Sequence, residues 1–447
     1  MNWEQLLSVK RTGQPVRPRT EHDRTQFQRD YDRLIFSSPF RRMQDKTQVF
    51  PLPGSIFVHN RLTHSLEVAS VGRSLGNNIS KFLKEKLNVT TPLVEELGAV
   101  TAAACLAHDM GNPPFGHSGE KAISIFFKNG EGAKYVDVID NAQIVSDFTD
   151  FEGNANALRL LTHQFTGRRN GGFGLTYTTL ASIIKYPYPS GMAGKKKYGY
   201  FKTEERVFLQ IADELGLPVD KSDSRVFARH PLVFLVEAAD DICYQLMDIE
   251  DAHKLGILSF SDTRTLFLSF FDSHEDSSQL RLIQDVEKEV TDTNELLAFM
   301  RALVIGKVVG EVTDIFIKNH DNILNGSFNS SLIKKLGAVS YHAMEQCKVA
   351  GRQTIYVHPS VVEVEIAGFK ILGTLLKEFC SAVMNPGDYY SSLLLPFIPQ
   401  QFRVDDSAPV YKKIQTVLDF VSSMTDVYAL DLYRKINGMG LSDKRVL

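Results

Sequence analysis

Apolar residues recur every three or four positions over long stretches of this chain, and this helical period constrains its fold more than any other feature. Between Pro231 and Asp251 the steps run 3-4-3-4-3, the spacing of one buried helical face, through Leu232, Leu235, Ala239, Ile242, Leu246 and Ile249. The same reasoning predicts helices from about Thr63 to Phe82 and from Pro92 to Ala107, the latter rich in small residues near its end. We therefore predict an all-α fold.

Two stretches lack this period, and we expect them to be irregular. The first, residues 129–150, is acidic and weakly periodic. The second, residues 186–202, contains prolines, glycines and the basic run Lys195–Lys197, for which composition alone favours a solvated surface loop. A short segment from Gln353 to Ile366 alternates weakly, which indicates a small β element near the C-terminal third of the chain.

The charge balance limits the class of partner. Lys and Arg number 50 against 53 Asp and Glu, a formal net charge of −3 over 447 residues. This near-neutral balance excludes a generally polybasic surface of the kind that coats nucleic acid. A polyanion would have to bind at a local site.

The sequence also indicates where the protein works. No signal peptide is recognisable, and the longest uncharged apolar run, Leu97 to Ala107, is far shorter than the ~20 residues that span a bilayer. The cysteines show no CxxC spacing, so they are expected to be buried thiols in a reducing compartment: Cys105, Cys243, Cys347 and Cys380. We expect a cytoplasmic protein without a membrane partner.

The dipeptide His108-Asp109 is the centre of the candidate chemistry. It ends a predicted buried helix and presents two side chains that can bind a metal. Alone, such a pair is more often a helix end that faces water. His64 and Asp240 lie on two other predicted helices, and a set of two imidazoles and two carboxylates suits Mn²⁺, Fe²⁺ or Mg²⁺.

Asp240 also belongs to a row of functional candidates. At about 100° per residue, Asp240, Tyr244 and Asp248 share one helical face, about half a turn from the apolar stripe. An ordinary solvated acidic face would give the same row. Glu237 and Asp241 add negative charge nearby, which would favour a bound cation.

A stiff turn follows the dipeptide. Its prolines and glycines, from Gly111 to Gly116, are expected to deliver His117 to the start of another helix with Ser118 as its N-cap. Glu120 would then orient the His117 imidazole and raise its basicity, as a general acid or base near neutral pH requires. The alternative is that Glu120 complements the helix dipole and His117 is a polar loop residue.

With these residues in view, the chain resembles the HD-domain metal-dependent phosphohydrolases, and within them the bacterial deoxyguanosinetriphosphate triphosphohydrolases (dGTPases). A generic HD match needs only the His…His-Asp…Asp pattern, whereas the longer strings here are specific to the dGTPase branch. The strings are RRMQDKTQVFP (41–51), RLTHS (61–65), HDMGNPPFGHSGE (108–120), FEGNA (151–155), EAADDI (237–242) and MTDVYA (424–429).

The resemblance implies a role for each candidate. One divalent ion, Mn²⁺, Mg²⁺ or a similar metal, would be bound by His64, His108, Asp109 and Asp240. His117, supported by Glu120, would be the acid/base residue beside the α-phosphate. The remaining candidates would bind substrate: Arg61, Lys185, Tyr186 and Lys197 the triphosphate, Tyr244 and Asp248 the sugar, and Gln48 the 3′-hydroxyl. Glu365 is a guess for a residue that reads the base.

The implied reaction is hydrolysis of dGTP, and of other dNTPs, to deoxynucleoside and tripolyphosphate, which would control dNTP pools. Two alternatives are an HD phosphohydrolase acting on another nucleotide and a non-catalytic protein that binds nucleotides or single-stranded DNA. The resemblance also implies a homo-oligomer, commonly a hexamer, and a regulatory nucleotide. The compact stretch between Phe127 and Phe151 argues against single-stranded DNA binding, because longer members carry an insertion there.

The same motifs suggest how the chain is divided. The motifs that contribute to the single predicted site lie between residues 48 and 248, so we expect an HD-type phosphohydrolase core over residues 1–258. Residues 259–447 would form a C-terminal helical region packed on this core, without being an independent module.

Overall fold

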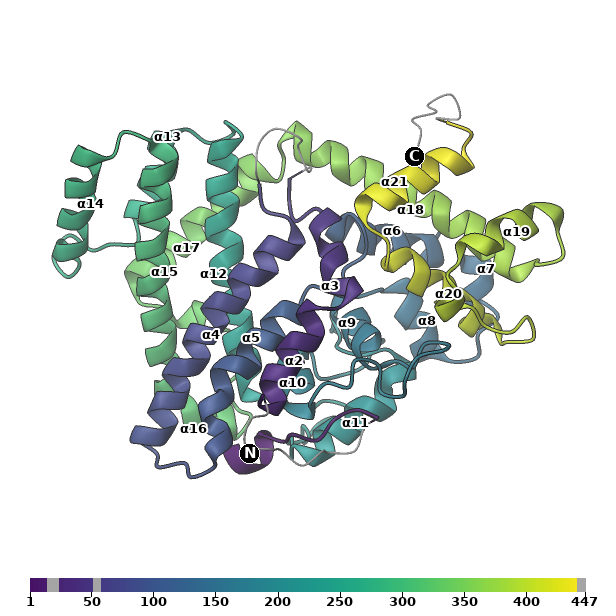
Figure 1. The fold of residues 1–447 in the computed structure, drawn as a ribbon, viewed down its shortest axis with the longest axis horizontal. Coiled ribbons are helices and arrows are strands. Elements are labelled where there is room, and N and C mark those ends of the chain that lie inside the picture. The colour runs from purple at the N-terminus through teal and green to yellow at the C-terminus, as the bar shows by residue number, and fades with distance from the viewer. Residues whose placement is uncertain (14–23, 51–57, 440–447) are drawn as a thin grey trace.

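The computed structural model describes residues 1–13, 24–50 and 58–439, and helices joined by loops make up most of this part of the chain (Figure 1). The first half comprises α1 Trp3–Leu6, α2 Gln26–Ile35, α3 Ser38–Arg42, α4 Arg61–Glu85, α5 Leu97–Ala107, α6 Gly116–Lys128, α7 Ala133–Val136, α8 Ala142–Thr149, α9 Gly153–Thr162, α10 Tyr177–Ile183, α11 Glu205–Glu214 and α12 Pro231–Lys254. The second half comprises α13 Phe260–Leu268, α14 Ser277–Glu289, α15 Thr293–Lys318, α16 His320–Leu324, α17 Ala338–Ala350, α18 Pro359–Met384, α19 Tyr389–Leu394, α20 Val410–Ser422 and α21 Asp426–Ile436. In these described ranges β structure is limited to isolated bridges such as Thr47 with Asn60, which agrees with the all-α prediction.

The helices α4, α5 and α12 pack together at the centre of the molecule (Figure 1). Small residues let α4 and α5 approach closely. A Cβ atom added at Gly72 would lie 2.5 Å from Cys105 Sγ, and one at Gly76 would lie 2.6 Å from the Leu97 carbonyl oxygen. Each of these central helices carries candidate metal ligands or leads directly to them, so their close packing positions the site.

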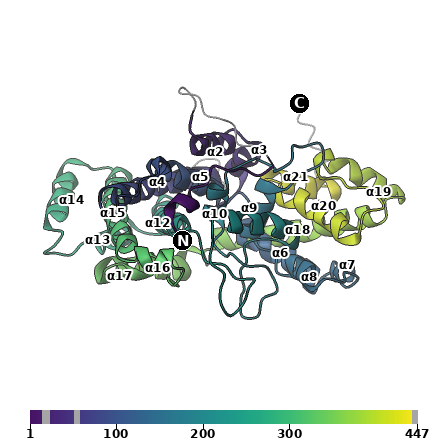
Figure 2. The same cartoon turned by 90° about the horizontal axis from the view of Figure 1, so that it is seen from below.

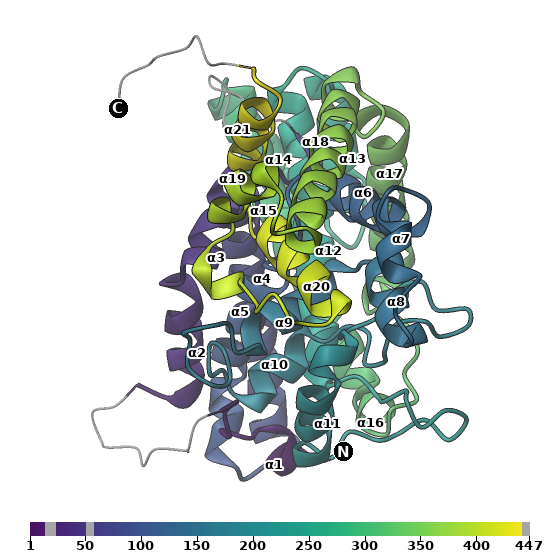
Figure 3. The ribbon, with the colours of Figure 1, turned by 90° about the vertical axis from the view of Figure 1, so that its right-hand side faces the viewer.

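Further helices lie at the two ends of the molecule, on either side of this centre. α13, α14 and α15 lie at one end of the elongated molecule and α19 and α20 at the other (Figures 1 and 2). α15 packs against α4 and α12, whereas α18 packs against α6, α20 and α21. Figure 3 shows α20 and α21 on the face next to α18. Helices from the C-terminal third therefore pack directly against α6, which carries His117.

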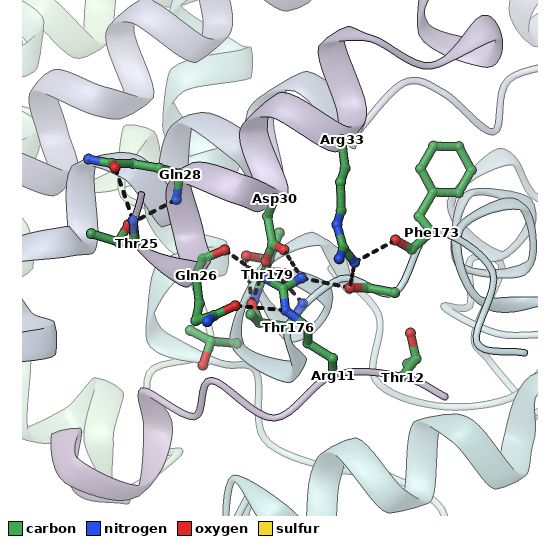
Figure 4. A network of polar contacts seen from close by, with 12 residues as sticks. Arg11, Thr12, Thr25, Gln26, Gln28, Asp30, Arg33, Phe173, Thr176 and Thr179 are labelled. Carbon is green, nitrogen blue, oxygen red and sulfur yellow. Dashed lines mark hydrogen bonds and ion pairs between the residues drawn. The ribbon is translucent and has the colours of Figure 1, made fainter. Parts of the chain in front are cut away.

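A buried polar network fixes the N-terminal segment against α10 (Figure 4). Arg11 Nη1 donates to Asp30 Oδ1 at 2.5 Å and to the Gly174 carbonyl oxygen at 2.6 Å. Asp30 Oδ2 accepts hydrogen bonds from the backbone N–H and the hydroxyl of Thr176, at 3.0 and 2.6 Å. Thr176 is the N-cap of α10, and Lys185 follows the other end of that helix. This network thus anchors the helix that leads to Lys185.

Three local predictions were wrong. The segment from Gln353 to Ile366 is no β element: it runs from the π-helical turn Gly351–Ile355 into α18, and packing overrides the local alternation. Residues 129–150, expected to be irregular, contain α7 and α8. Ser118 is not the N-cap of α6, because the helix already begins at Gly116 and Phe115 is its N-cap. The Ser118 hydroxyl instead donates a hydrogen bond to the Glu365 carbonyl oxygen at 2.8 Å.

Two predictions about the chain as a whole can be compared with the structure. All four cysteines are buried and unpaired, as expected. Among the described helices, none combines the length and the apolar character needed to cross a membrane. The division of the chain at residue 258 stays a prediction.

Candidate functional site

A cavity of about 560 Å³ lies where α4, α5, α6 and α12 meet, and the loops after α10 complete its wall. Most of the residues singled out from the sequence line it: Gln48, Arg61, His108, Asp109, His117, Glu120, Lys185, Tyr186, Lys197, Asp240 and Tyr244. His64 and Asp248 do not line this cavity. The fold therefore brings residues separated by almost 200 positions in the sequence to one place.

The candidate metal ligands form a compact cluster. Ligand atoms of His64, His108 and Asp109 all lie within 4.8 Å of one another. His64 is almost fully buried, and its Nε2 lies 3.1 Å from Asp240 Oδ1. His108 Nε2 lies 3.5 Å from the same oxygen. Asp240 thus joins the cluster through contacts with both imidazoles.

The state of His108 suits a metal ligand. Its Nδ1 lies 2.6 Å from the Cys105 carbonyl oxygen, so this nitrogen is committed to donating a hydrogen bond. Nε2 is buried and has no hydrogen-bond partner. In the neutral ring, an Nδ1–H held by a carbonyl leaves the lone pair of Nε2 for a metal ion, which is the usual arrangement in metal sites. The donor set therefore fits a divalent ion.

The electrostatics of the cluster lead to the same conclusion. Burial opposes a charge on His108, but the carboxylates of Asp109 and Asp240 outweigh it and raise the pKa to about 9. Burial likewise opposes ionisation of Asp240, but His108 and His64 outweigh it and hold the pKa of Asp240 well below its usual value. Such coupling shows that the cluster favours positive charge at its centre.

The second group on the cavity wall consists of His117, Lys197 and the two glutamates that contact them, Glu120 and Glu152. His117 Nδ1 lies 2.9 Å from Glu120 Oε2, and the His117 side chain is 78% exposed. The other Glu120 oxygen accepts a hydrogen bond from the backbone N–H of Gly153 at 2.8 Å. Lys197 Nζ lies 3.0 Å from Glu152 Oε2. Glu120 therefore fixes one His117 nitrogen and leaves Nε2 available.

The three cationic candidates for phosphate binding are each paired with a carboxylate. Arg61 Nη1 lies 2.6 Å from Asp109 Oδ2, and Lys185 Nζ lies 3.1 Å from Glu237 Oε1. Burial opposes the charge on Lys185, but the carboxylate of Glu237 outweighs it and holds the pKa of the lysine above its usual value. These cations lie on the same cavity wall as the metal cluster, and each is balanced by an acid.

The row on α12 divides between two cavities. Tyr244 lines the main cavity and stacks on Tyr356, with ring centroids 6.2 Å apart and planes at 17°. Tyr356 donates a hydrogen bond to Asp248 Oδ2 at 2.7 Å. Asp248 lines a second cavity, of about 490 Å³, that shares the two tyrosines with the first. Burial raises the pKa of Asp248 to about 8.

The sequence did not point to several residues of the wall. Tyr356 lies inside the segment that the sequence wrongly predicts as a β element, and Glu152 belongs to the FEGNA string without a predicted role of its own. Glu365, guessed as a base-reading residue, does line the cavity. Gln48 is also on the wall, and its side-chain oxygen is buried without a hydrogen-bond partner in the protein.

Comparison with known proteins gives two family matches. Residues 61–216 match the HD domain, and residues 339–435 match the phosphohydrolase-associated domain. The first match contains His64, His108 and Asp109, whereas Asp240 lies beyond its end.

Similar proteins extend over nearly the whole chain. A deoxyguanosinetriphosphate triphosphohydrolase-like protein of Synechocystis is 37% identical over 99% of this chain and 100% of its own length. One of Pseudomonas aeruginosa is 36% identical, over 98% of this chain and 99% of its own. A deoxyguanosinetriphosphate triphosphohydrolase of Yersinia enterocolitica is 27% identical, again over 98% of this chain and 99% of its own.

Proposed function

The chain belongs to the family of HD-domain deoxyguanosinetriphosphate triphosphohydrolases and triphosphohydrolase-like proteins, and from this premise we propose that it hydrolyses dGTP to deoxyguanosine and tripolyphosphate. Other dNTPs are secondary substrates in this proposal. The observation that carries it is the buried Nε2 of His108, which has no hydrogen-bond partner and faces Asp240 in a cavity that cationic side chains also line, Arg61, Lys185 and Lys197 among them. A metal site beside cationic side chains suits the hydrolysis of a phosphate ester, because both stabilise the negative charge of the phosphate groups.

The metal would be held by His64, His108, Asp109 and Asp240. A bound divalent ion, Mn²⁺ or Mg²⁺, supplies Lewis-acid polarisation of an α-phosphate oxygen and acidifies water. His64 and His108 supply neutral nitrogen ligands, and the two aspartates supply the negative charge that balances the ion. The raised pKa of His108 supports this assignment, because it reports a site rich in negative charge.

The cations of the cavity would bind the triphosphate. Arg61, Lys185 and Lys197 each lie against a carboxylate, and phosphate oxygens would replace those partners when the nucleotide binds. Arg61 presents a planar set of donors, which matches two phosphate oxygens better than an ammonium does. Tyr186 follows Lys185 in the chain and lies on the same wall. The three cations would offset most of the charge of the substrate.

His117 would exchange a proton at Nε2. The Glu120 carboxylate accepts a hydrogen bond from Nδ1, which fixes the orientation of the ring. The exposed ring can reach either the leaving 5′-oxygen or the nucleophilic water. In this role His117 assists a step in which the water oxygen bonds to the α-phosphorus and the bond from that phosphorus to the 5′-oxygen breaks. The 5′-oxygen takes up a proton and leaves as the deoxynucleoside, and the three phosphates are released as one tripolyphosphate.

Sugar selection would depend on the α12 row and the loop after Thr47. A deoxyribose lying on the Tyr244 ring would leave no room for a 2′-hydroxyl, and Asp248 supports that ring through Tyr356. Gln48 offers a free side-chain oxygen to the 3′-hydroxyl. A cytoplasmic location and a homo-oligomer, as a hexamer, complete the proposal without bearing on the chemistry of one site.

One assay tests the function. The purified protein is incubated with Mn²⁺ or Mg²⁺ and each dNTP or NTP, and the phosphorus products are separated by ion exchange. We expect tripolyphosphate and deoxyguanosine, with dGTP turned over fastest. Release of pyrophosphate or orthophosphate would contradict the reaction, and equal rates with dGTP and GTP would contradict the sugar selection. Asp240→Asn protein is the matched control for contaminating phosphatases.

A further inference from the structure

Asp426, in a motif near the C-terminus, contacts both loops that border the cavity. It is the first residue of α21, where Thr425 is the N-cap, and it is 7% exposed. Its Oδ2 accepts a hydrogen bond from the Thr47 backbone N–H at 2.8 Å, and its Oδ1 accepts one from the Phe115 backbone N–H at 2.9 Å. The two amides are 379 and 311 positions away in the sequence. One carboxylate therefore joins two distant segments.

Each of these amides lies next to a candidate substrate or catalytic residue. Thr47 immediately precedes Gln48, and Phe115 is two residues before His117. The loop at Phe115 cannot easily hold its own shape, because Phe115 has φ +61° and ψ +20°, a left-handed conformation that non-glycine residues rarely adopt. As the N-cap of α6, Phe115 also provides no side-chain hydrogen bond to that helix. The strained turn must be held by its surroundings, and Asp426 contacts it directly.

A buried lysine supports the same junction. Lys46 is 4% exposed, and its Nζ donates to the carbonyl oxygens of Asn112, at 2.7 Å, and of Ser422, at 3.0 Å. Its own carbonyl oxygen accepts a hydrogen bond from the Arg61 backbone N–H at 3.1 Å. Lys46 and Asp426 thus link the end of α20 and the start of α21 to the turn that carries His117 and to the start of α4.

We propose that Asp426 is a positioning residue for the reaction, which holds Gln48 and His117 in register through the two backbone amides. This inference rests on the proposed function. It adds that the phosphohydrolase-associated domain, residues 339–435, contributes to catalysis through Asp426. Because Asp426 faces backbone groups and does not line the cavity, it acts only through the residues that do.

A purely structural role is the alternative, and Asp419 provides a matched control for it. Asp419 is also 7% exposed and lies on the neighbouring helix α20. It forms a buried ion pair with Arg159, at 2.7 Å from both Nε and Nη2. It too links the C-terminal helices to the first half of the chain, but neither it nor Arg159 lines the cavity.

The test compares Asp426→Asn and Asp419→Asn with wild type. Asparagine keeps the shape of the side chain but turns one acceptor into a donor, which opposes one of the two backbone N–H groups. For Asp426→Asn we expect a fall in kcat for dGTP of about tenfold or more, with the Kd for Mn²⁺ within about twofold of wild type. For Asp419→Asn we expect a lower Tm and a kcat within about twofold of wild type. A kcat for Asp426→Asn within twofold of wild type, or losses of kcat that track Tm in both variants, would overturn the proposal.

Amide hydrogen exchange of the wild-type protein provides a second measurement that needs no variant. The amides of Thr47 and Phe115 should exchange slowly, and exchange at the rate of an unstructured peptide would also overturn the proposal. If wild type releases no tripolyphosphate from any dNTP, the proposed function has failed. In that case the exchange rates of the Thr47 and Phe115 amides still test whether Asp426 holds the two loops. A failure of the proposed function can therefore be told apart from a failure of the positioning role.

Discussion

Arg61 Nη1 lies 2.6 Å from Asp109 Oδ2, so a guanidinium is in contact with one of the carboxylates of the metal cluster. Arg61 is the first residue of α4, and His64 follows one turn later on the same helix. Because ligand atoms of His64 and Asp109 lie close together, this spacing also brings Arg61 close to Asp109. A Cβ atom added at Gly116 would lie 2.6 Å from Arg61 Nη2, so the turn before His117 is shaped around this side chain. Arg61 therefore contacts both the metal cluster and the loop that leads to His117.

The first prediction concerns Arg61→Lys. A lysine keeps the charge but loses the planar set of donors that matches two phosphate oxygens. We expect the KM for dGTP to rise about tenfold, which corresponds to roughly 1.4 kcal/mol of binding free energy, while Mn²⁺ affinity is not reduced. Steady-state kinetics and calorimetric titration with Mn²⁺ check both parts. Lys121→Gln, which removes an exposed charge from the same cavity, serves as control and should change KM less.

The second prediction separates the metal ligands from the acid/base residue. His117→Ala should lower kcat by about 10²–10⁴, the usual contribution of general acid–base catalysis, and should still bind Mn²⁺. Asp240→Ala should lose the metal, because Asp240 Oδ1 contacts both imidazoles of the cluster. Electron paramagnetic resonance of free Mn²⁺ measures the binding of both variants. Equal loss of metal in the two would show that His117 has been assigned the wrong role.

The central helices and the set of site residues could be predicted from the sequence because both depend on local patterns. The apolar period gave α4 and α12 to within a few residues at each end, and the dipeptide His108-Asp109 does follow the short helix α5. The segment from Gln353 to Ile366 alternates weakly between apolar and polar residues, and this pattern wrongly predicts a β element. Tertiary packing overrides that pattern, since Gly368 of α18 fits against Phe115.

The partners of the site residues could not be predicted in the same way. Glu237 and Glu152 neutralise Lys185 and Lys197 from 52 and 45 positions away in the sequence, and no local period encodes such contacts. The same holds for Asp426, whose partners are backbone amides that any residue could supply. Tertiary contacts of this kind decide the electrostatics of the site, and they require the folded structure.

The third prediction concerns sugar selection by Tyr244. In Tyr244→Leu the flat ring that stacks on Tyr356 is lost, and a 2′-hydroxyl gains room. We expect the ratio of kcat/KM for dGTP over GTP to fall about tenfold, the scale of discrimination that removing a steric contact in a pocket usually changes. Tyr244→Phe keeps the ring and should keep the ratio near that of wild type. An unchanged ratio in Tyr244→Leu would contradict the steric explanation.

The fourth prediction concerns the dependence of stability on pH, and it rests on His59, which joins the start of α4 to α12. His59 Nδ1 lies 2.8 Å from Asp251 Oδ2, and Nε2 lies 3.0 Å from Glu67 Oε1. Burial opposes the charge on the ring, but hydrogen bonds to Asp251 and Glu67 outweigh it and raise the pKa to about 10, against 6.5 in the unfolded chain. Between these two values the folded state binds more protons than the unfolded state.

The unfolding free energy that His59 contributes is therefore fully present below about pH 6.5 and falls as the pH rises toward 10, by at most about 1.4 kcal/mol per pH unit. Lys46 acts in the opposite sense, because burial lowers its pKa to about 7 and its folded state gains stability as the pH rises. The test is therefore the difference between wild type and His59→Gln, measured by urea unfolding from pH 6 to pH 9. This difference should shrink steadily with rising pH, since only wild type carries the titrating ring. A difference that stays constant over this range would show that His59 stabilises the junction of α4 and α12 by packing and not by its charge.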